Sequence, residues 1–233
     1  MLSQTLLFVE DDARLRTLTS EYLCNNGFQV IAFENADNVE QAIDTIPIDL
    51  VILDVMLPGM DGLSLCKQLR KKYTGPILFL TAKVSSFDEL NGFEIGADDY
   101  ISKPVDPPVL LARVRALLRR IPSAESTTIN KLIFGQLVIE SGSRSVTLGE
   151  KPVALTSQEF DLILMLAQNA GNIVTRDRIY KELIGREYDG LDRSADMRIS
   201  RIRKKLNDNS QYPYRIKTIW GKGFFFVANA WNE

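Results

Sequence analysis

The sequence of 233 residues has no histidine, only two cysteines and no apolar run long enough to cross a membrane. Without histidine, the chain has no imidazole base and no imidazole metal ligand, so any phosphohistidine must belong to another protein. The N-terminal apolar run, residues 6–9, is too short for a signal peptide. We therefore expect a cytoplasmic protein that does not bind a membrane.

The two cysteines, Cys24 and Cys66, are far apart, and each lies among apolar residues at helical spacing. We expect two buried thiols rather than a disulfide. The chain is 45% hydrophobic and 25% charged, which is typical of a globular protein. Its length allows one large domain or two ordinary ones.

The charge is divided unevenly along the chain. Residues 1–120 carry 17 acidic and 12 basic residues, whereas residues 131–233 carry 12 acidic and 16 basic residues. The segment between them holds a single charged residue, Glu125. An acidic half joined to a basic half favours a regulatory domain attached to a domain that binds a polyanion.

Short apolar runs alternate with amphipathic segments through the first half of the sequence. We expect strands at residues 6–9, 29–33, 50–53, 76–80 and 99–101, and helices near residues 15–23, 36–46, 63–73, 87–95 and 108–120. Five such strand–helix units predict an α/β domain, residues 1–121, with a doubly wound five-stranded parallel sheet. Functional groups in such folds gather at the carboxyl ends of the strands.

The pattern changes after a small, polar linker at residues 122–130. We expect short strands at residues 132–138, 144–148 and 152–154, helices near 157–167, 176–184 and 193–206, and a closing hairpin at 214–227. Thr156 and Glu159 form a capping box that opens the first of these helices. Residues 131–233 are therefore predicted to be a second, α+β domain.

Carboxylates follow two of the predicted parallel strands. Glu10, Asp11 and Asp12 follow the first strand, and Asp54 follows the third. Gathered at one sheet edge, these groups repel one another unless a cation lies among them, and their hard oxygen atoms suit Mg²⁺. Such an ion would also offset the charge of an incoming phosphoryl group. Taken singly, each acid could equally be a helix cap, as Asp12 illustrates.

Two more polar side chains, Thr81 and Lys103, follow the fourth and fifth predicted strands. A hydroxyl and an ammonium group beside carboxylates and Mg²⁺ form a phosphate site. In that site Asp54 would be the nucleophile, and it would become an aspartyl phosphate.

The segments FVEDD, LDVMLPGMDG, LTA and ADDYISKP resemble the receiver domain of two-component response regulators. The resemblance covers about residues 4–120. It implies a flavodoxin-like fold and a phosphoacceptor, Asp54, that a sensor histidine kinase phosphorylates with the help of Thr81 and Lys103. The implied Mg²⁺ ligands are Glu10, Asp11, Asp54 and the carbonyl of Met56, with Asp12 extending the acidic pair. Thr81 and Tyr100 would form the switch pair.

The most basic segment, residues 193–206, has apolar residues on one helical face and cations on the other. Such a helix can dock on a core and enter a major groove, where Arg201 and Lys204 would read base edges and Met197 a thymine methyl. Flanking cations would meet phosphates. The alternative is an ordinary solvated helix with a basic end. The following hairpin could place Lys222 in a minor groove.

The segments LTSQEFDLILML, GNIVTRDRIYKEL, RSADMRISRIRKKL and YRIKTIWGKGFFF resemble the winged-helix domain of the OmpR/PhoB family, and YDGLDRS and PYRIKT resemble its RstA-type members. The resemblance implies binding to double-stranded promoter DNA, RNA polymerase as a partner and an RstB-like cognate kinase. The implied DNA contacts are Arg193, Met197, Arg198, Ser200, Arg201, Arg203, Lys204, Thr218 and Lys222. Trp220 stands where the family usually carries arginine.

The resemblance also implies that phosphorylation produces a homodimer through the receiver. The implied interface residues are Phe87, Leu90, Asp98, Asp99, Leu110 and Arg113. Val109 and Glu89 stand where the family usually has an acidic and a basic residue, so one symmetric salt bridge is missing. Exposed salt bridges contribute only ~0–1 kcal/mol each, and we still expect a C2 dimer through apolar contacts.

Two other functions compete with this interpretation. Phosphatases of the haloacid dehalogenase type also use a strand-end aspartate and Mg²⁺, but they need a second aspartate two residues further on. Val55 and Met56 follow Asp54, so we expect no enzyme. Alternatively, the basic helix binds only a protein partner. DNA binding through several phosphates would weaken steeply with salt and would separate these two outputs.

Overall fold

A computed structural model describes residues 3–81, 95–118, 131–208 and 212–232. The chain divides into two compact units, residues 1–119 and 120–233, and each is described by itself. The predicted linker and residues 87–94 of the predicted helix near residues 87–95, with Phe87 and Leu90, lie outside the described residues. Among the described helices, none has the length and apolar character needed to span a bilayer.

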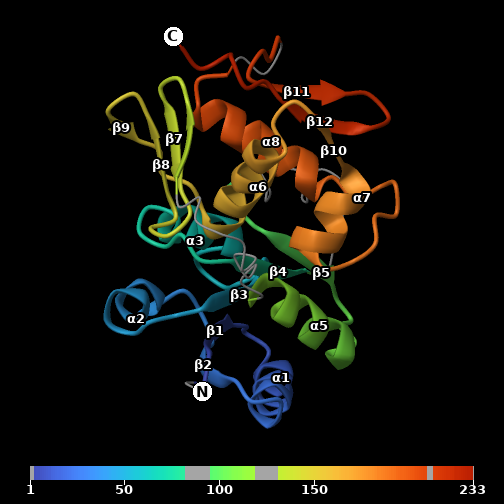
Figure 1. Ribbon diagram of the computed structural model, residues 1–233. Helices are drawn as coiled ribbons and strands as arrows, with labels where there is room; N and C mark the ends of the chain where they lie inside the picture. The colour runs from blue at the N-terminus through green and yellow to red at the C-terminus, as the bar shows by residue number, and fades with distance from the viewer. Residues whose placement is uncertain (1–2, 82–94, 119–130, 209–211, 233) are drawn as a thin grey trace. The chain divides into compact units, whose positions relative to one another are not determined.

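The N-terminal unit is built on a five-stranded parallel sheet with the strand order β2-β1-β3-β4-β5 (Figure 1). The strands are β1 (Thr5–Val9), β2 (Gln29–Phe33), β3 (Leu50–Asp54), β4 (Ile77–Thr81) and β5 (Asp99–Ser102). Three of them, β1, β3 and β4, are buried along their whole length, which explains their unbroken apolar runs. The predicted α/β fold class is confirmed.

Helices surround this sheet, and their described members are α1 (Ala13–Asn25), α2 (Val39–Thr45), α3 (Gly62–Leu69) and α5 (Pro107–Leu118). On one face of the sheet, Leu23 of α1 and Val114 of α5 belong to the same apolar cluster as Phe8 of β1. Cys66 is buried as predicted, but Cys24 is exposed, so that prediction is wrong. Leu23 takes the core position on α1, and Cys24 lies about 100° further round the helix.

The C-terminal unit begins with a four-stranded antiparallel sheet in the order β6-β7-β8-β9. These strands are β6 (Lys131–Phe134), β7 (Leu137–Glu140), β8 (Ser145–Leu148) and β9 (Lys151–Pro152). The single strand predicted at residues 132–138 is in fact two strands, because the chain turns at Gly135, which has φ +51°. A Cβ atom at Gly135 would lie 2.6 Å from the carbonyl oxygen of Trp231.

Three helical segments and a second sheet complete this unit (Figure 1). They are α6 (Ser157–Gln168), α7 (Arg176–Ile179) continued by the π-helical turn η1 (Tyr180–Ile184), α8 (Ser194–Lys205), and the strands β10 (Ile173–Thr175), β11 (Ile216–Ile219) and β12 (Gly223–Phe226). The predicted hairpin is present as β11–β12, and β10, which was not predicted, pairs with β12. The predicted capping box is confirmed, since Thr156 and Glu159 cap α6 reciprocally.

Candidate functional site: an acidic pocket and a basic helix

Three carboxylates meet at the carboxyl edge of the parallel sheet. Glu10 and Asp11 follow β1, Asp54 ends β3, and Val9 pairs with Leu53 in the adjacent strand. One oxygen atom from each acid lies within 4.8 Å of the others. Glu10 and Asp54 are buried, whereas Asp11 is exposed. The pocket therefore opens to solvent on the Asp11 side.

Lys103, which follows β5, reaches into this pocket. Its Nζ atom lies 2.7 Å from an oxygen of Asp54 and 2.7 Å from an oxygen of Glu10. Burial raises the pKa of Glu10, although its hydrogen bond from Lys103 acts in the opposite direction. Burial would lower the pKa of Lys103, but the hydrogen bonds to Asp54 and Glu10 outweigh it and raise that pKa. Lys103 is therefore cationic at neutral pH.

The donor set of the pocket fits Mg²⁺, because it consists of carboxylate oxygens open to water. The loop after β3 is fixed by the Met56 amide, which donates to Asp54 at 3.0 Å. Gly62 permits this loop, since a Cβ atom there would lie 2.0 Å from the carbonyl oxygen of Asp54. Asp12 does not extend the acidic pair, because its carboxylate caps α1 by accepting from the amides of Arg14 and Leu15.

Thr81 and Tyr100 lie on the next two strands of the same sheet. Thr81 is buried at the carboxyl end of β4, and Lys103 donates its amide to the Thr81 carbonyl at 2.7 Å. Tyr100 is 8% exposed, and its ring stacks on Phe79 with the centroids 5.1 Å apart. The structure thus gathers Glu10, Asp11, Asp54, Thr81 and Lys103 at one edge of the sheet.

The C-terminal unit carries the basic helix α8 on its core. Its apolar face, Ala195, Ile199, Ile202 and Leu206, is fully buried. The exposed polar residues of this segment are Arg193, Ser200, Lys204 and Lys205, and Met197 is half-buried. These are the side chains of the segment that the C-terminal unit leaves open to solvent.

Three arginines of α8 do not behave as free cations. Arg198, Arg201 and Arg203 are all buried. Arg201 forms an ion pair with Glu159, and Arg203 donates to the carbonyl of Ile216 and to the hydroxyl of Thr218. In this structure the side chains of Arg201 and Arg203 therefore contact protein, and the predicted base and phosphate contacts of the three arginines stay predictions. The helical pattern alone does not show which cations meet carbonyls and carboxylates of their own domain.

Comparisons with known proteins cover both units. Residues 6–115 match the response regulator receiver domain, and residues 149–226 match the family described as transcriptional regulatory protein, C terminal. Transcriptional regulatory protein RstA of Escherichia coli K12 is 44% identical over 98% of this chain and 99% of its own length. The chain belongs to the OmpR/PhoB family of two-component response regulators.

Further relatives agree with this family assignment. Regulatory protein VanR of Enterococcus faecium is 37% identical over 96% of this chain and 98% of its own length. The crystal structure of DrrB, an OmpR/PhoB homolog of Thermotoga maritima, shares 33% identity with a TM-score of 0.50 and covers 97% of this chain and 100% of its own. The family is one of non-enzymatic transcriptional regulators, so the prediction of no enzyme is confirmed.

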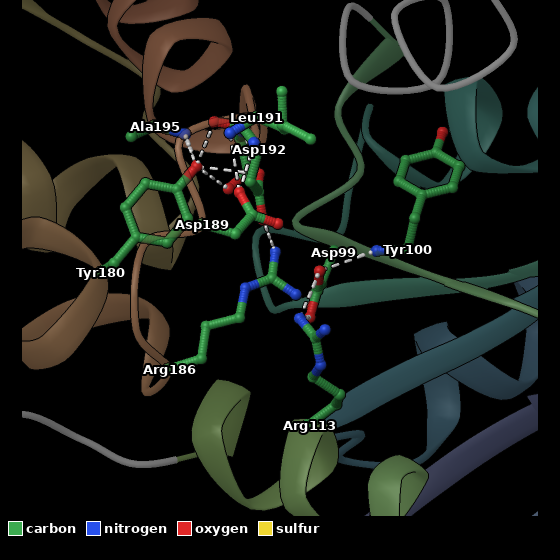
Figure 2. Close-up of polar contacts among 10 residues, drawn as sticks. Asp99, Tyr100, Arg113, Tyr180, Arg186, Asp189, Leu191, Asp192 and Ala195 are labelled. Atoms are coloured by element: carbon green, nitrogen blue, oxygen red, sulfur yellow. Dashed lines mark hydrogen bonds and ion pairs between the residues drawn. The ribbon is translucent and has the colours of Figure 1, made fainter. Parts of the chain in front are cut away.

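Two residues that the family resemblance placed in a dimer interface are internal in this response regulator. Asp98 is fully buried, and it accepts from Arg70 at 2.6 Å and from the Ile77 amide at 2.9 Å. Leu110 belongs to the core beneath α5. Both side chains stabilise the receiver itself, and their place in a dimer interface stays a prediction. Asp99 and Arg113 form an ion pair of 2.9 Å within the chain (Figure 2).

The loop before α8 is held by a polar network that the sequence analysis missed (Figure 2). The Tyr180 hydroxyl donates to Asp192 at 2.8 Å, Arg186 is ion-paired with Asp192, and the Ser194 amide donates to Asp192 at 2.8 Å. Burial raises the pKa of Tyr180 to about 12, so the hydroxyl remains protonated. The network fixes the first turn of α8, which begins directly after Arg193. Asp192 lies within YDGLDRS, but that motif does not reveal its partners.

Proposed function

We propose that Asp54 accepts a phosphoryl group from a cognate sensor histidine kinase of the RstB-like type. The observation that carries this proposal is the position of Lys103, whose ammonium group lies 2.7 Å from both Asp54 and Glu10. A carboxylate oxygen of Asp54 attacks phosphorus while the bond to the donor histidine breaks. Lys103 then balances part of the added negative charge.

A magnesium ion would be held by Glu10, Asp11, Asp54 and the carbonyl of Met56, and it supplies charge neutralisation when bound. Asp11 is exposed, so it can take this role without loss of a buried contact. Glu10 is already oriented by Lys103. The residues of the pocket therefore need little rearrangement to accept both a cation and a phosphoryl group.

Phosphorylation would reach the surface of the receiver through Thr81 and Tyr100. The Thr81 hydroxyl moves to donate to the new phosphoryl oxygens, and the Tyr100 ring, which stacks on Phe79, turns to fill the space that Thr81 vacates. We propose that the same change favours a C2 homodimer. Asp99 and Arg113 are suited to it, because a pair within one chain can be exchanged for pairs across a two-fold axis.

The output is regulation of transcription through double-stranded promoter DNA. We propose that α8 enters a major groove with Arg193, Ser200 and Lys204 facing the bases and phosphates, and Met197 beside them. The loop fixed by Asp192 keeps the start of this helix in place. RNA polymerase is the proposed protein partner at the promoter, and the cytoplasm, where promoter DNA lies in bacteria, is the proposed location.

Labelling with a small acyl or amido phosphate in the presence of Mg²⁺ tests the phosphoryl site. We expect the intact chain to gain one phosphoryl group by mass spectrometry, and Asp54→Asn to gain none. Asp61→Asn is the matched control, because Asp61 is an exposed acid that caps α3 in the same loop. Labelling that persists in Asp54→Asn would refute the assigned acceptor.

A further inference from the structure

The loop between β1 and α1 is held by one guanidinium group. The Nη1 atom of Arg16, on α1, donates to the carbonyl of Glu10 at 2.6 Å and to the carbonyl of Asp11 at 3.0 Å. The side chain of Arg16 is 20% exposed, and its Nη2 atom lies 4.0 Å from a carboxylate oxygen of Glu34, which is mostly exposed. One side chain thus contacts two consecutive peptide groups of the loop that carries the acidic pair.

These two bonds act on the carboxylate of the pocket that burial does not fix. Glu10 is fully buried and forms an ion pair with Lys103, whereas Asp11 is exposed. The direction of the Asp11 side chain is set by the two planar peptide groups on either side of its Cα atom. The carbonyl of Glu10 belongs to the first of these groups and the carbonyl of Asp11 to the second, and Arg16 holds both. Arg16 therefore restricts the direction in which Asp11 projects its carboxylate.

The two ends of this loop have anchors of their own. The Glu10 amide donates to the carbonyl of Phe33 at 3.0 Å, and the carboxylate of Asp12 caps α1. Asp11 lies between these anchors, and the bonds from Arg16 are added at this point. Loss of Arg16 should therefore leave the strand and the helix in place and loosen the backbone at Asp11.

We propose that Arg16 is a positioning residue for the divalent cation, because it keeps the Asp11 carboxylate turned towards the carboxylates of Glu10 and Asp54, which it approaches within 4.8 Å. This inference rests on the proposed Mg²⁺-assisted phosphorylation of Asp54 and adds to it the group that shapes the cation site. The charge of Arg16 has the opposite effect, since a cation so near the site repels Mg²⁺. Positioning and charge thus predict changes of opposite sign in Mg²⁺ affinity when Arg16 is replaced.

Mg²⁺ titration of the full-length chain separates these two effects. The affinity is fitted from the rise in the melting temperature of the receiver with Mg²⁺ concentration, followed by circular dichroism. Arg16→Met keeps an apolar stem but removes both donors, and it should bind Mg²⁺ about tenfold more weakly, as is typical when a group that orients a metal ligand is lost. Arg14→Met removes an exposed cation from the same helix, and it should bind Mg²⁺ at least as tightly as the wild type.

Melting without Mg²⁺ gives a second readout, which a merely structural role of Arg16 would not change. Asp11→Asn relieves repulsion among three carboxylates, so it should raise the melting temperature by about 2 °C when Arg16 is present. In the Arg16→Met background the Asp11 carboxylate can turn away from the pocket into water. The same substitution should then raise the melting temperature by less than about half as much, because the two sites are coupled. Arg16→Gln, which keeps a polar side chain, is a second variant and should behave like Arg16→Met in both experiments.

The outcomes separate this inference from the proposed function. Mg²⁺ binding by the Arg16 variants that equals or exceeds wild-type binding contradicts the positioning role and leaves the cation site in place. An equal loss of affinity in Arg14→Met contradicts it as well, as does an undiminished effect of Asp11→Asn in the Arg16→Met background. Failure of both Arg16 variants to fold also contradicts it, because Arg16 would then support the whole receiver. A wild-type melting temperature that does not respond to Mg²⁺ contradicts the proposed cation site itself.

Discussion

Glu159 and Arg201 form an ion pair of 3.0 Å that joins the capping box of α6 to the basic helix α8. Glu159 is almost fully buried, and it also accepts from Lys205 at 2.7 Å. One carboxylate thus caps one helix and fixes the side of another. Arg201 therefore helps to fix the orientation of α8 within the C-terminal unit.

The first prediction concerns removal of this buried charge. Glu159→Gln should lower the free energy of unfolding of the C-terminal unit by about 3 kcal/mol, because a buried cation loses its partner. Trp231 emission in a Trp220→Phe background reports urea unfolding of this unit. Glu182→Gln is the control, since its pair with Arg178 is exposed and should contribute less than ~0.5 kcal/mol. Equal effects of both changes would contradict the structural role of Glu159.

The Glu159 carboxylate should also make the free energy of unfolding of the C-terminal unit depend on pH in the acid range. Burial would raise the pKa of Glu159, but Arg201 and Lys205 outweigh it and hold the pKa below its ordinary value of 4.5. When the pKa of an acid is lower in the folded than in the unfolded state, its ionised form stabilises the fold. This contribution is complete above the pKa of the unfolded state, and it is lost as the pH falls through the pKa of the folded state. Unfolding free energies measured below pH 4.5 should fall more steeply in the wild type than in Glu159→Gln. Identical curves would refute the pairing.

A substitution at Arg203 distinguishes a structural role of this side chain from a contact with a DNA phosphate. Arg203→Ala should lower the free energy of unfolding by about 1–3 kcal/mol, because the Ile216 carbonyl loses its donor. DNA affinity should fall without a change in the salt slope, which is the slope of log affinity against log salt concentration. A slope reduced by about 0.9 would instead show that Arg203 neutralises a phosphate in the complex.

Lys204 is the corresponding exposed cation of α8. Lys204→Ala should weaken DNA binding and reduce the salt slope by about 0.9, since its ammonium group is free to meet a phosphate. Lys151→Ala, which removes an exposed lysine from β9, should change neither quantity. A salt slope in Lys204→Ala that equals the slope in Lys151→Ala would exclude Lys204 from the interface.

When no cation is bound, repulsion among the carboxylates of the acidic pocket should lower the stability of the receiver. Asp11→Asn removes one of three mutually repelling carboxylates, so the receiver should melt about 2 °C higher without Mg²⁺. Added Mg²⁺ should raise the melting temperature of the wild type but not of Asp11→Asn. Circular dichroism of the full chain measures both effects, with Asp37→Asn as an exposed acidic control. A lower melting temperature for Asp11→Asn without Mg²⁺ would contradict the repulsion.

The sequence predicts the parallel sheet well, because strands buried on both faces leave unbroken apolar runs such as residues 50–53. It predicts the helix start at Thr156 for a local reason, since the capping box spans only four residues, Thr156 to Glu159. It misses β10, residues 173–175, where the exposure pattern holds a single buried residue, Val174. The sequence also predicts a single strand where the structure has β6 and β7, because the turn at Gly135 does not interrupt the apolar pattern on either side of it.

The receiver site is predictable for the same reason, since the carboxyl ends of adjacent parallel strands must meet. The basic helix is less predictable. Its apolar face follows from spacing, but Arg201 and Arg203 bind Glu159 and Ile216, which lie more than ten residues away in the sequence. The Tyr180–Asp192 bond likewise joins two elements whose approach depends on the whole fold.

The most direct measurement of the central claim is the affinity of the full-length chain for a duplex selected from a random-sequence pool, before and after phosphorylation by a small phosphoryl donor with Mg²⁺. We predict that affinity rises in the wild type in proportion to the phosphorylated fraction, and that Asp54→Asn shows no rise under the same conditions. A rise that persists in Asp54→Asn, or a fully phosphorylated wild type whose affinity is unchanged, would contradict the account.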